Sequence, residues 1–427
     1  MRAILFGGLI LGLAVAAALP SCGEAGEALV RGAASANGGE SGIALDCPAS
    51  GVLHGPWSLH FDETSIRVRW DACKKSPAAI TVTPERGGAS RTVEGEQTAS
   101  EVLTSYDVVK TIAPDLPGTY YRTEVAVTGL APSTCYRYEL TAEKGRGGRF
   151  CTARTLGDPF VFLAIGDTNP AVGDTDGVLA SVTDGKTFGQ KPDFSVHLGD
   201  MQYYDSVFES YATWFPAMAP LFEAGALEPS VGNHELERAH EFEDYYKRLF
   251  GGAGFDGPVE YYRFESGGVW FFSLDTELEL TPSSAQGTWL EAQLADAAAK
   301  PGFRFSVVYF HKPWLTLAAY PHFPELRKHY LPSFQKYGVR LVLQGHIHGY
   351  ERFIENGITY VVSGGGGAAL HDLDASVATR PDEAKARIFR AKRYHGTLFQ
   401  VQTDRLDGRA IANDGSELDA FSIDLGK

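Results

Sequence analysis

Hydrophobic and polar residues alternate with a period of two in the first part of the chain. The runs Ser65–Trp70 and Thr123–Val127 show this alternation, which is typical of strands with one buried face. Turn-forming stretches such as Gly87-Gly88 and Leu116–Gly118 separate the strand-like runs, as in domains built from many short strands. The pattern predicts an all-β sandwich over residues 49–156.

The pattern changes after Pro159. Apolar runs of strand length now alternate with amphipathic stretches of helical length. The apolar runs are Phe160–Ile165, Phe194–Leu198, Trp270–Leu274, Phe305–Phe310 and Arg340–Leu343, and the helical stretches are Leu236–Phe250, Ser283–Ala299 and Glu325–Tyr337. Strands that alternate with helices predict an α/β domain over residues 157–427, with layered sheets flanked by helices.

The N-terminal residues have the features of an export signal. Met1-Arg2 precedes the apolar run Ala3–Leu19, which is slightly shorter than the roughly 20 residues of a membrane-spanning helix. We predict a signal peptide over residues 1–21. The sequence Leu19–Cys22 resembles the lipobox of bacterial lipoproteins, in which the cysteine carries the lipid anchor. Pro20 departs from that pattern, and the alternative is plain secretion after cleavage near Ala16–Ala18.

Residues 22–48 are rich in Gly, Ala, Ser and Glu. Because such a segment has little apolar surface to bury, we predict a flexible linker between the anchor and the first folded domain.

The cysteines support export. Apart from Cys22 there are four, Cys47, Cys73, Cys135 and Cys151, and four cysteines allow three pairings. Cys135 and Cys151 flank a turn-rich stretch between two strand-like runs, so a hairpin would bring them together. This favours the pairs Cys135–Cys151 and Cys47–Cys73 over reduced thiols. Disulfides in turn indicate an oxidising compartment.

The formal net charge of −15 argues against nonspecific binding to nucleic acid or anionic lipid, because there is no basic excess to replace counterions. If an anionic substrate binds, local positive charge has to come from elsewhere, and metal ions are one source. The glycine run Gly364–Gly367 is not followed by Gly-Lys-Ser/Thr, so we expect a tight bend beside the site instead of a nucleotide loop.

Five apolar runs in the second part end in a residue that can bind metal. These residues are Asp167, Asp200, Asn233, His311 and the pair His346 and His348. Each is weak evidence alone, since Gly-Asp is also a common turn dipeptide. However, layered α/β folds place their ligands beyond the carboxyl ends of strands. We therefore expect these side chains to converge on one sheet edge.

The ordered motifs resemble those of the calcineurin-like metallophosphoesterase superfamily. They are Gly166-Asp167, Gly199-Asp200, Gly232-Asn233-His234-Glu235, His311 and Gly345-His346-Ile347-His348. Tyr203, three residues after Asp200, and the sequence Tyr350-Glu351-Arg352 after His348 resemble the purple acid phosphatases. Where the wider superfamily has a histidine two residues after the first aspartate, this chain has Asn169, which fits replacement of that ligand by Tyr203.

That family also has a fibronectin type III-like domain in front of its catalytic domain. The stretch Val127–Tyr138 resembles the end of such a domain. The resemblance implies a fibronectin type III-like domain over residues 49–156 and a metallophosphoesterase catalytic domain over residues 157–427. A structural role is expected for the first domain, and carbohydrate or partner binding is the alternative.

The resemblance implies two metal ions bridged by Asp200. The first ion would be held by Asp167, Tyr203 and His348, and the second by Asn233, His311 and His346. Two anionic oxygens beside the bridge suit Fe³⁺, whereas neutral nitrogens and an amide oxygen suit a divalent ion such as Zn²⁺, Fe²⁺ or Mn²⁺. Tyr204 is a rival to Tyr203, although the spacing from Asp200 favours Tyr203.

The resemblance also implies roles in catalysis and substrate binding. His234 corresponds to the general acid that protonates the leaving group. His322, eleven residues after His311, is a candidate for substrate binding together with Asn233 and His234, with a surface histidine as the alternative. Tyr350–Arg352 would orient the histidine pair His346 and His348.

These inferences predict a phosphatase that hydrolyses small phosphomonoesters by means of a metal-activated hydroxide. A phosphodiesterase or nucleotidase on the same scaffold is the alternative within this class. A surface-binding protein, in which the sandwich is the active part and the metal site is inert, is the alternative from another class. We expect no nucleic-acid binding, and the oligomeric state is left open.

Overall fold

The computed structural model describes residues 47–426 except 103–117, 204–213, 237–245 and 252–257. Residues Leu45–Lys427 form one compact unit. The predicted signal peptide, Cys22 and Tyr204 lie outside the described residues. Among the helices that the structure describes, none is long and apolar enough to cross a bilayer.

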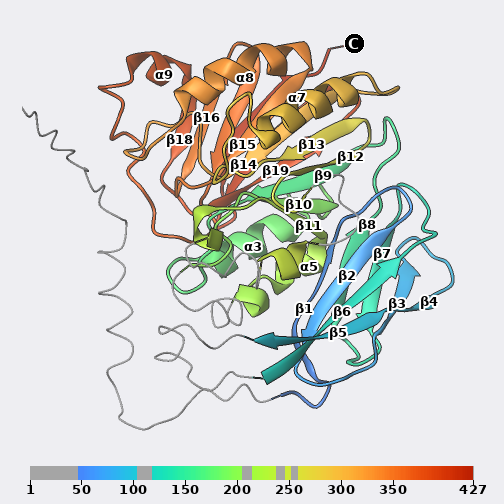
Figure 1. The fold of residues 1–427 in the computed structure, drawn as a ribbon. Helices are drawn as coiled ribbons and strands as arrows, with labels where there is room; N and C mark the ends of the chain where they lie inside the picture. Colours follow the sequence, from blue (N-terminus) through green and yellow to red (C-terminus); the bar gives the residue numbers. More distant parts are fainter. Residues whose placement is uncertain (1–46, 103–117, 204–213, 237–245, 252–257, 427) are drawn as a thin grey trace, which may run out of the picture. The chain divides into compact units, whose positions relative to one another are not determined.

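The first domain consists of two four-stranded antiparallel sheets (Figure 1, blue to teal). One contains, in spatial order, β1 (Val52–Leu59), β2 (Ile66–Ala72), β6 (Gly118–Val127) and β5 (Glu96–Val102); the other contains β4 (Arg91–Glu94), β3 (Ala79–Pro84), β7 (Cys135–Leu140) and β8 (Gly147–Cys151). The all-β prediction is confirmed, and its likeness to fibronectin type III domains stays a prediction.

Both predicted disulfides are present. Cys135 on β7 and Cys151 on β8 are directly opposite each other in the antiparallel pairing and are bonded. Cys47 and Cys73 form the second bond, which links the start of the described chain to the end of β2. The turn between the two strand-like runs does bring the first pair together, as the sequence predicts.

The second domain contains a six-stranded and a seven-stranded sheet. The six-stranded sheet has the order β11 (Ala226–Pro229), β10 (Phe194–His197), β9 (Phe160–Ile165), β19 (His395–Val401), β20 (Arg405–Ala412) and β21 (Glu417–Asp424). The seven-stranded sheet has the order β12 (Tyr262–Ser266), β13 (Val269–Ser273), β14 (Phe305–Phe310), β15 (Val339–Gln344), β17 (Ile358–Ser363), β16 (Tyr350–Glu355) and β18 (Arg387–Ala391). All five predicted strands are confirmed, each within one residue.

The apolar runs show little alternation of apolar and polar residues because their strands are buried on both faces. On β9, Phe160, Phe162 and Ala164 pack in the core between the two sheets, whereas Val161, Leu163 and Ile165 pack in a second core under helices. Phe162 meets Phe271 of the facing sheet edge to face, with ring centroids 5.2 Å apart. The two-residue period of a strand thus serves two cores at once.

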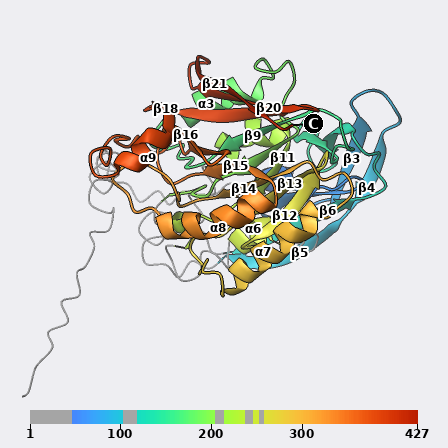
Figure 2. The same ribbon diagram turned by 90° about the horizontal axis from the view of Figure 1, so that it is seen from above.

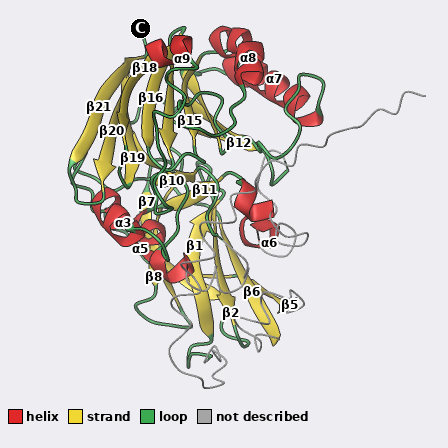
Figure 3. Ribbon diagram, turned by 90° about the vertical axis from the view of Figure 1, so that its left-hand side faces the viewer, coloured by secondary structure: helices red, strands yellow, loops and turns green. Residues whose placement is uncertain are grey.

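Helices cover the outer faces of both sheets (Figures 2 and 3). Helix α3 (Thr175–Thr183) packs on the six-stranded sheet near the short α5 (Ala219–Ala224). Helices α7 (Ala285–Ala298) and α8 (Pro324–Lys336) pack on the seven-stranded sheet, and the four-residue α6 (Lys247–Phe250) and α9 (Pro381–Ala386) complete the described α-helices. The layered α/β prediction is confirmed.

Local signals set the ends of the predicted helices. Ser284 caps α7 by accepting a hydrogen bond from the amide of Gly287, and α8 ends just before Gly338, whose φ of +70° cannot continue a helix. Of the predicted helix Leu236–Phe250, residues 237–245 lie outside the described residues. Helix α3 was not predicted, because its nine residues are too few for a clear period.

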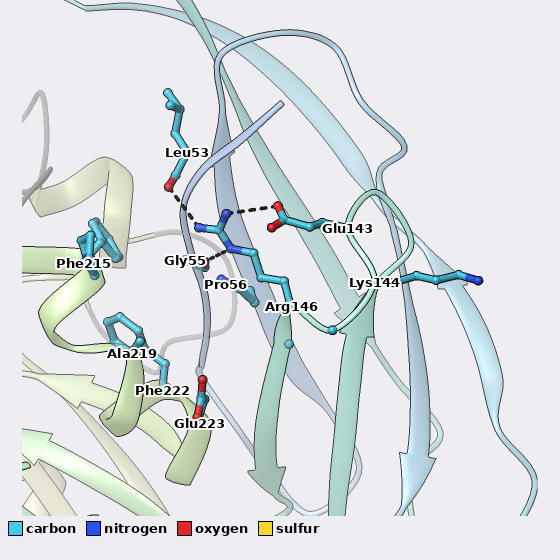
Figure 4. A pocket seen from close by; sticks show the side chains of 13 residues that line it. Leu53, Gly55, Pro56, Glu143, Lys144, Arg146, Phe215, Ala219, Phe222 and Glu223 are labelled. Carbon is cyan, nitrogen blue, oxygen red and sulfur yellow. Dashed lines mark hydrogen bonds and ion pairs between the residues drawn. The ribbon is translucent and has the colours of Figure 1, made fainter. Parts of the chain in front are cut away.

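A cleft of about 420 Å³ lies between the sandwich and helix α5 (Figure 4). Phe215 and Phe222 line one side, and Arg146 lies on the other. The Arg146 guanidinium donates to the carbonyl oxygens of Leu53 and Gly55 at 3.0 and 2.8 Å. Its donors therefore fasten the β7–β8 turn to β1, and this cleft contains none of the predicted metal ligands.

The sandwich also supports the strand that leads to Asn233. Buried Glu228 on β11 accepts a hydrogen bond from the backbone amide of His60 at 2.6 Å, and the His60 ring lies 2.9 Å from the carbonyl oxygen of Phe250. Burial raises the pKa of Glu228 to about 8 and lowers that of His60 well below its usual value. The contact between the domains is therefore a buried, neutral pair at mildly acidic pH.

We predict that Glu228→Gln reduces the pH dependence of stability. Between about pH 4.5 and 8 the folded protein keeps a proton on Glu228 that the unfolded chain releases, so this group makes stability fall as the pH rises through that window. A neutral glutamine removes the effect. Thermal unfolding at pH 5 and pH 8 should show a smaller difference for the variant than for wild type or for Glu325→Gln, whose side chain is exposed; equal differences would contradict the assignment.

Candidate metal centre

All seven predicted metal ligands lie just beyond the carboxyl ends of strands or in the loops that follow them. Asp167, Asp200 and Asn233 follow β9, β10 and β11, which are parallel neighbours in the six-stranded sheet. His311 follows β14, and His346 and His348 follow β15, its parallel neighbour in the other sheet. The two facing sheets thus contribute to one site, as the strand-end argument predicts.

Three of these side chains form a triangle of electron-rich atoms. The phenol oxygen of Tyr203 lies 3.2 Å from Asp167 Oδ1 and 3.2 Å from His348 Nε2. His348 Nε2 lies 3.3 Å from the same Asp167 oxygen. The three donor atoms come from three separate loops and differ in chemistry, and they are nearly equidistant.

A second cluster surrounds His311. Its Nε2 lies 3.1 Å from each of three atoms, Asp200 Oδ2, Asn233 Oδ1 and His346 Nδ1. A single imidazole nitrogen carries at most one proton, so it can donate to only one of these three. The remaining contacts bring lone pairs together, which is favourable only if a cation lies among them.

The donor atoms fit metal ions in spacing and in kind. Ligands about 2.1 Å from a metal lie about 3.0 to 3.4 Å from one another in octahedral or tetrahedral geometry, and the separations in both clusters fall in that range. The ligating atoms of Asp200, His311 and His346 all lie within 4.8 Å of one another. The triangle offers a carboxylate, a phenol and an imidazole, and the second cluster a carboxylate, an amide oxygen and two imidazoles.

The electrostatics also favour positive charge in the site. Burial opposes the charged form of His311, but the carboxylate of Asp200 outweighs burial and raises the pKa of His311 to about 10. Burial and the charges of Asp167 and Asp200 raise the pKa of the Tyr203 phenol well above its usual value. Deprotonation of Tyr203 therefore requires additional positive charge beside it.

The backbone is strained where it turns into the site. Asp167, Asp200 and His346 have φ values of +59°, +52° and +68°, a region that costs a residue other than glycine about 1 to 2 kcal/mol. The loops approach so closely that a Cβ atom on Gly232 would lie 2.3 Å from Asp200 Oδ1. A Cβ atom on Gly364 would lie 2.6 Å from Asp167 Oδ2, so the glycine run is the tight bend beside the site that the sequence predicts.

Glu235 holds two of these loops together. Its buried carboxylate accepts hydrogen bonds from the amides of Asp200 and Met201 at 2.8 Å each and of Gly232 at 2.7 Å. It therefore satisfies three donors in a stretch that has no regular secondary structure. This explains the acidic residue of the Gly-Asn-His-Glu motif, which the sequence analysis left without a role.

His234 lies at the edge of both clusters. Its amide donates to Asp200 Oδ1 at 2.9 Å, its Nε2 lies 3.7 Å from Asp200 Oδ2, and its ring lies 4.2 Å from the ring of Tyr203. The side chain is partly exposed. His234 therefore lies beside Asp200 and Tyr203 and is accessible from solvent.

His322, which the sequence predicts as a substrate-binding residue, bonds to residues outside the two donor clusters. Its Nε2 lies 3.2 Å from Glu383 Oε1 on α9, the same oxygen that pairs with Arg327 on α8. Among the described residues it has no recorded contact with either cluster. Its role in substrate binding stays a prediction.

The prediction that Tyr350–Arg352 orients the histidine pair is wrong in detail. Tyr350 and Arg352 both bond to Asp419 on β21, at 2.8 and 2.6 Å. Glu351 accepts from the amide of Leu317 at 3.1 Å. These hydrogen bonds fasten β16 to β21 and to a neighbouring loop, and none of the contacts found among the described residues joins the three side chains to His346 or His348.

Two residues beside the site were missed by the sequence analysis. These residues are His371 and Tyr320. The ring of His371 stacks on that of His348, with centroids 3.9 Å apart. The ring of Tyr320 stacks in turn on that of His371, with centroids 4.3 Å apart. Both lie in loops without periodicity, far apart in sequence, and no family motif includes them. Only the distance of His371 from the glycine run, four residues after Gly367, could have indicated that it lies near the site.

The match to known families follows this geometry. Residues 160–350 match the family model described as calcineurin-like phosphoesterase. The chain contains a calcineurin-like phosphoesterase domain. The matched residues include all seven predicted metal ligands, and proteins of this family depend on a dinuclear metal centre.

The relatives of this phosphoesterase domain include purple acid phosphatases. Purple acid phosphatase 23 of Arabidopsis thaliana is 28% identical over 243 residues, which cover 52% of this chain and 50% of that protein. Acid phosphatase A of Cryphonectria parasitica is 23% identical over 414 residues, which cover 71% of this chain and 78% of that protein. The chain thus spans about half the length of the plant relatives that it matches.

A solved structure supports the same fold. A purple acid phosphatase isolated from yellow lupin (Lupinus luteus) seeds matches with a TM-score of 0.66 at 17% identity, covering 87% of this chain and 75% of that one. The match extends well beyond the phosphoesterase domain, so the β-sandwich lies in the compared region. At this identity the likeness concerns the fold.

We predict that Glu235→Ala lowers the free energy of unfolding by several kcal/mol. Each buried amide that loses its acceptor costs about 1 to 3 kcal/mol, and three amides depend on this carboxylate. The free energy of unfolding of Glu235→Gln, which keeps one acceptor oxygen, should lie between those of wild type and Glu235→Ala. Urea unfolding of these variants beside the exposed control Glu325→Ala measures the difference; an alanine variant as stable as that control would contradict the role.

Proposed function

We propose that the protein is a metal-dependent hydrolase of small phosphomonoesters, an acid phosphatase that requires two metal ions. The observation that supports this most directly is the pair of donor clusters at one sheet edge, with Asp200 in a loop that both share. Asp167 and Asp200 lie next to each other through backbone hydrogen bonds, from the Asp167 amide to the Gly199 carbonyl and from the Thr168 amide to the Asp200 carbonyl, both 3.1 Å.

The two sites differ in chemistry. Asp167, Tyr203 and His348 with Asp200 would hold one ion, and their anionic oxygens favour Fe³⁺. Asn233, His311 and His346 with Asp200 would hold the other, and their neutral donors favour a divalent ion such as Zn²⁺, Fe²⁺ or Mn²⁺. When bound, such a pair neutralises phosphate charge and makes hydroxide available at neutral or acidic pH. It would also supply the positive charge that an acidic chain otherwise lacks.

The protein's own residues would orient the ions and complete proton transfer. His311 Nδ1 donates to the carbonyl oxygen of Leu198 at 2.8 Å, so in the neutral ring Nε2 is the nitrogen that would serve as a ligand in place of its proton. His234 would donate a proton to the departing alkoxide, since it lies beside Asp200 and is accessible from solvent. Asn233 and His234 would also contact the substrate.

The site would act outside the cytoplasm. Two disulfides in the first domain fit an oxidising compartment, and the predicted signal peptide and lipobox point to export with an anchor at Cys22. A phosphodiesterase or nucleotidase would use the same metal centre and differ only in the walls of the pocket.

Purified full-length protein tests the proposal. It should contain close to two metal ions, one of them iron, and hydrolyse aryl and alkyl phosphomonoesters faster than diesters; chelation should abolish this and added metal restore it. A phenolate-to-Fe³⁺ absorption band should be present in wild type and Tyr337→Phe but absent from Tyr203→Phe. Metal-loaded protein without phosphoester hydrolysis would overturn the proposal, and faster diester cleavage would favour the alternative.

For His234 the expected result depends on the leaving group. His234→Asn should reduce kcat about 100- to 10,000-fold for alkyl phosphates, because an alkoxide needs a proton in order to leave. The same substitution should slow the hydrolysis of p-nitrophenyl phosphate much less, since the p-nitrophenolate leaving group is stable as an anion. Metal content should be unchanged. A uniform loss with both substrates would point to a role in binding and exclude His234 as the acid.

A further inference from the structure

His371 lies against a predicted metal ligand although it belongs to no motif. Its backbone amide donates to the carbonyl oxygen of His348 at 2.9 Å, and the His348 amide donates in return to His371 Nδ1 at 3.2 Å. The two rings stack with an angle of 22° between their planes. Two hydrogen bonds and a ring contact thus join these residues.

The hydrogen bonds define the protonation of both rings. Since His371 Nδ1 accepts the His348 amide proton, the ring proton of neutral His371 is on Nε2, which faces the phenol oxygen of Tyr320 at 3.1 Å. His348 Nδ1 donates to the carbonyl oxygen of Ala369 at 2.7 Å. In the neutral ring the proton of His348 is therefore on Nδ1, and Nε2 faces Asp167 and Tyr203.

His371 is not itself a candidate ligand, because both its nitrogens are already in hydrogen bonds, with the His348 amide and with Tyr320. It acts on the site only through His348. The ring of Tyr320 also lies edge-on to that of His346, with centroids 5.5 Å apart. Tyr320 therefore contacts His346 of the histidine pair and also His371, which lies against His348.

The two loops that carry these residues are fastened to each other. Ser376 donates from its amide to the Leu317 carbonyl at 2.9 Å and from its hydroxyl to the Ala318 carbonyl at 3.0 Å. Arg380 donates to the Thr316 carbonyl at 3.0 Å. Tyr320 and His371 are thus held in place independently of any bound ion, as a preorganised support requires.

We propose that His371, held by Tyr320, is a positioning residue that fixes the backbone and ring plane of His348, whose tautomer the Ala369 carbonyl sets, so that Nε2 binds the metal shared with Asp167 and Tyr203. The inference rests on the proposed function in that this cluster binds a metal. The contact that decides it is the acceptor at Nδ1. Partners of this kind typically change metal affinity about 10- to 100-fold when they are removed.

The test compares four variants of the full-length protein. His371→Phe keeps a stacked ring but removes the acceptor, and His371→Asn restores an acceptor at the position of Nδ1 without the ring. Tyr320→Phe removes the hydroxyl that receives the Nε2 proton. His329→Phe is the matched control, because His329 also meets a tyrosine ring, Tyr330 at 4.9 Å, on the exposed side of α8.

Each metal-free variant is titrated with Fe³⁺, and binding is measured from the phenolate absorption band and by metal analysis. A separate titration with Zn²⁺ is measured by calorimetry. His371→Phe should bind Fe³⁺ about 10- to 100-fold more weakly and show a shifted band, while Zn²⁺ binding at the His311 and His346 site stays as in wild type. His371→Asn should recover most of the affinity, and Tyr320→Phe should lose less than His371→Phe. Thermal unfolding of the metal-free variants measures any general loss of stability.

The inference would be overturned if His371→Phe bound Fe³⁺ as tightly as His329→Phe does. It would also be overturned if His371→Asn and His371→Phe lost the same Fe³⁺ affinity, or if His371→Phe bound Fe³⁺ and Zn²⁺ more weakly by the same factor. These outcomes do not depend on hydrolysis. A wild type that binds both metals and cleaves no phosphoester would overturn the proposed function alone, and the affinities would still decide the role of His371.

Discussion

The structure depends on keeping electron-rich side chains within about 3 Å of one another at the edge of two sheets. Lone pairs of carboxylate, phenol, amide and imidazole groups repel one another unless a cation or protons lie between them. The surrounding chain therefore has to hold each donor against this repulsion. Three backbone positions with positive φ values, at Asp167, Asp200 and His346, are part of that cost.

The strain is offset by contacts that have no part in binding a metal. Glu235 accepts from three loop amides, and Gly232 and Gly364 allow backbone and side-chain atoms to approach more closely than any larger residue would permit. Further support comes from β16, where Glu351 bonds the loop that leads to Tyr320. The loops that carry the donor atoms are thus fixed by their own contacts. Because the donors are held in place in this way, they can form a site of defined geometry.

The sequence predicted those parts of the structure that a strong periodic pattern or strand end determines. Strands such as β9 and β14 were predicted to the residue because burial on both faces makes nearly every position apolar, and their ends placed Asp167 and His311. The sandwich and both disulfides followed from alternation and from cysteine spacing. The helix α3 was missed because it is short, and the 1–46 segment and Tyr204 lie outside the described residues.

Side-chain direction and contacts between loops could not be predicted from one sequence. Tyr350–Arg352 follows the histidine pair closely, yet the pleat of β16 directs Tyr350 and Arg352 to Asp419 on another sheet. His322 has the spacing of a pocket residue but meets an ion pair between two helices. His371 reaches the site only because its loop is fastened to that of Tyr320, and this depends on tertiary packing.

The contact between Glu228 and His60 has a consequence for how the two domains can evolve. Strand β11 belongs to the phosphoesterase sheet, but its carboxylate depends on an amide from the sandwich, and Asn233 follows only five residues later. A phosphoesterase domain separated from its sandwich would expose this strand and leave its carboxylate without that donor. A replacement of the sandwich therefore has to supply another donor to Glu228, because this strand leads directly to the site.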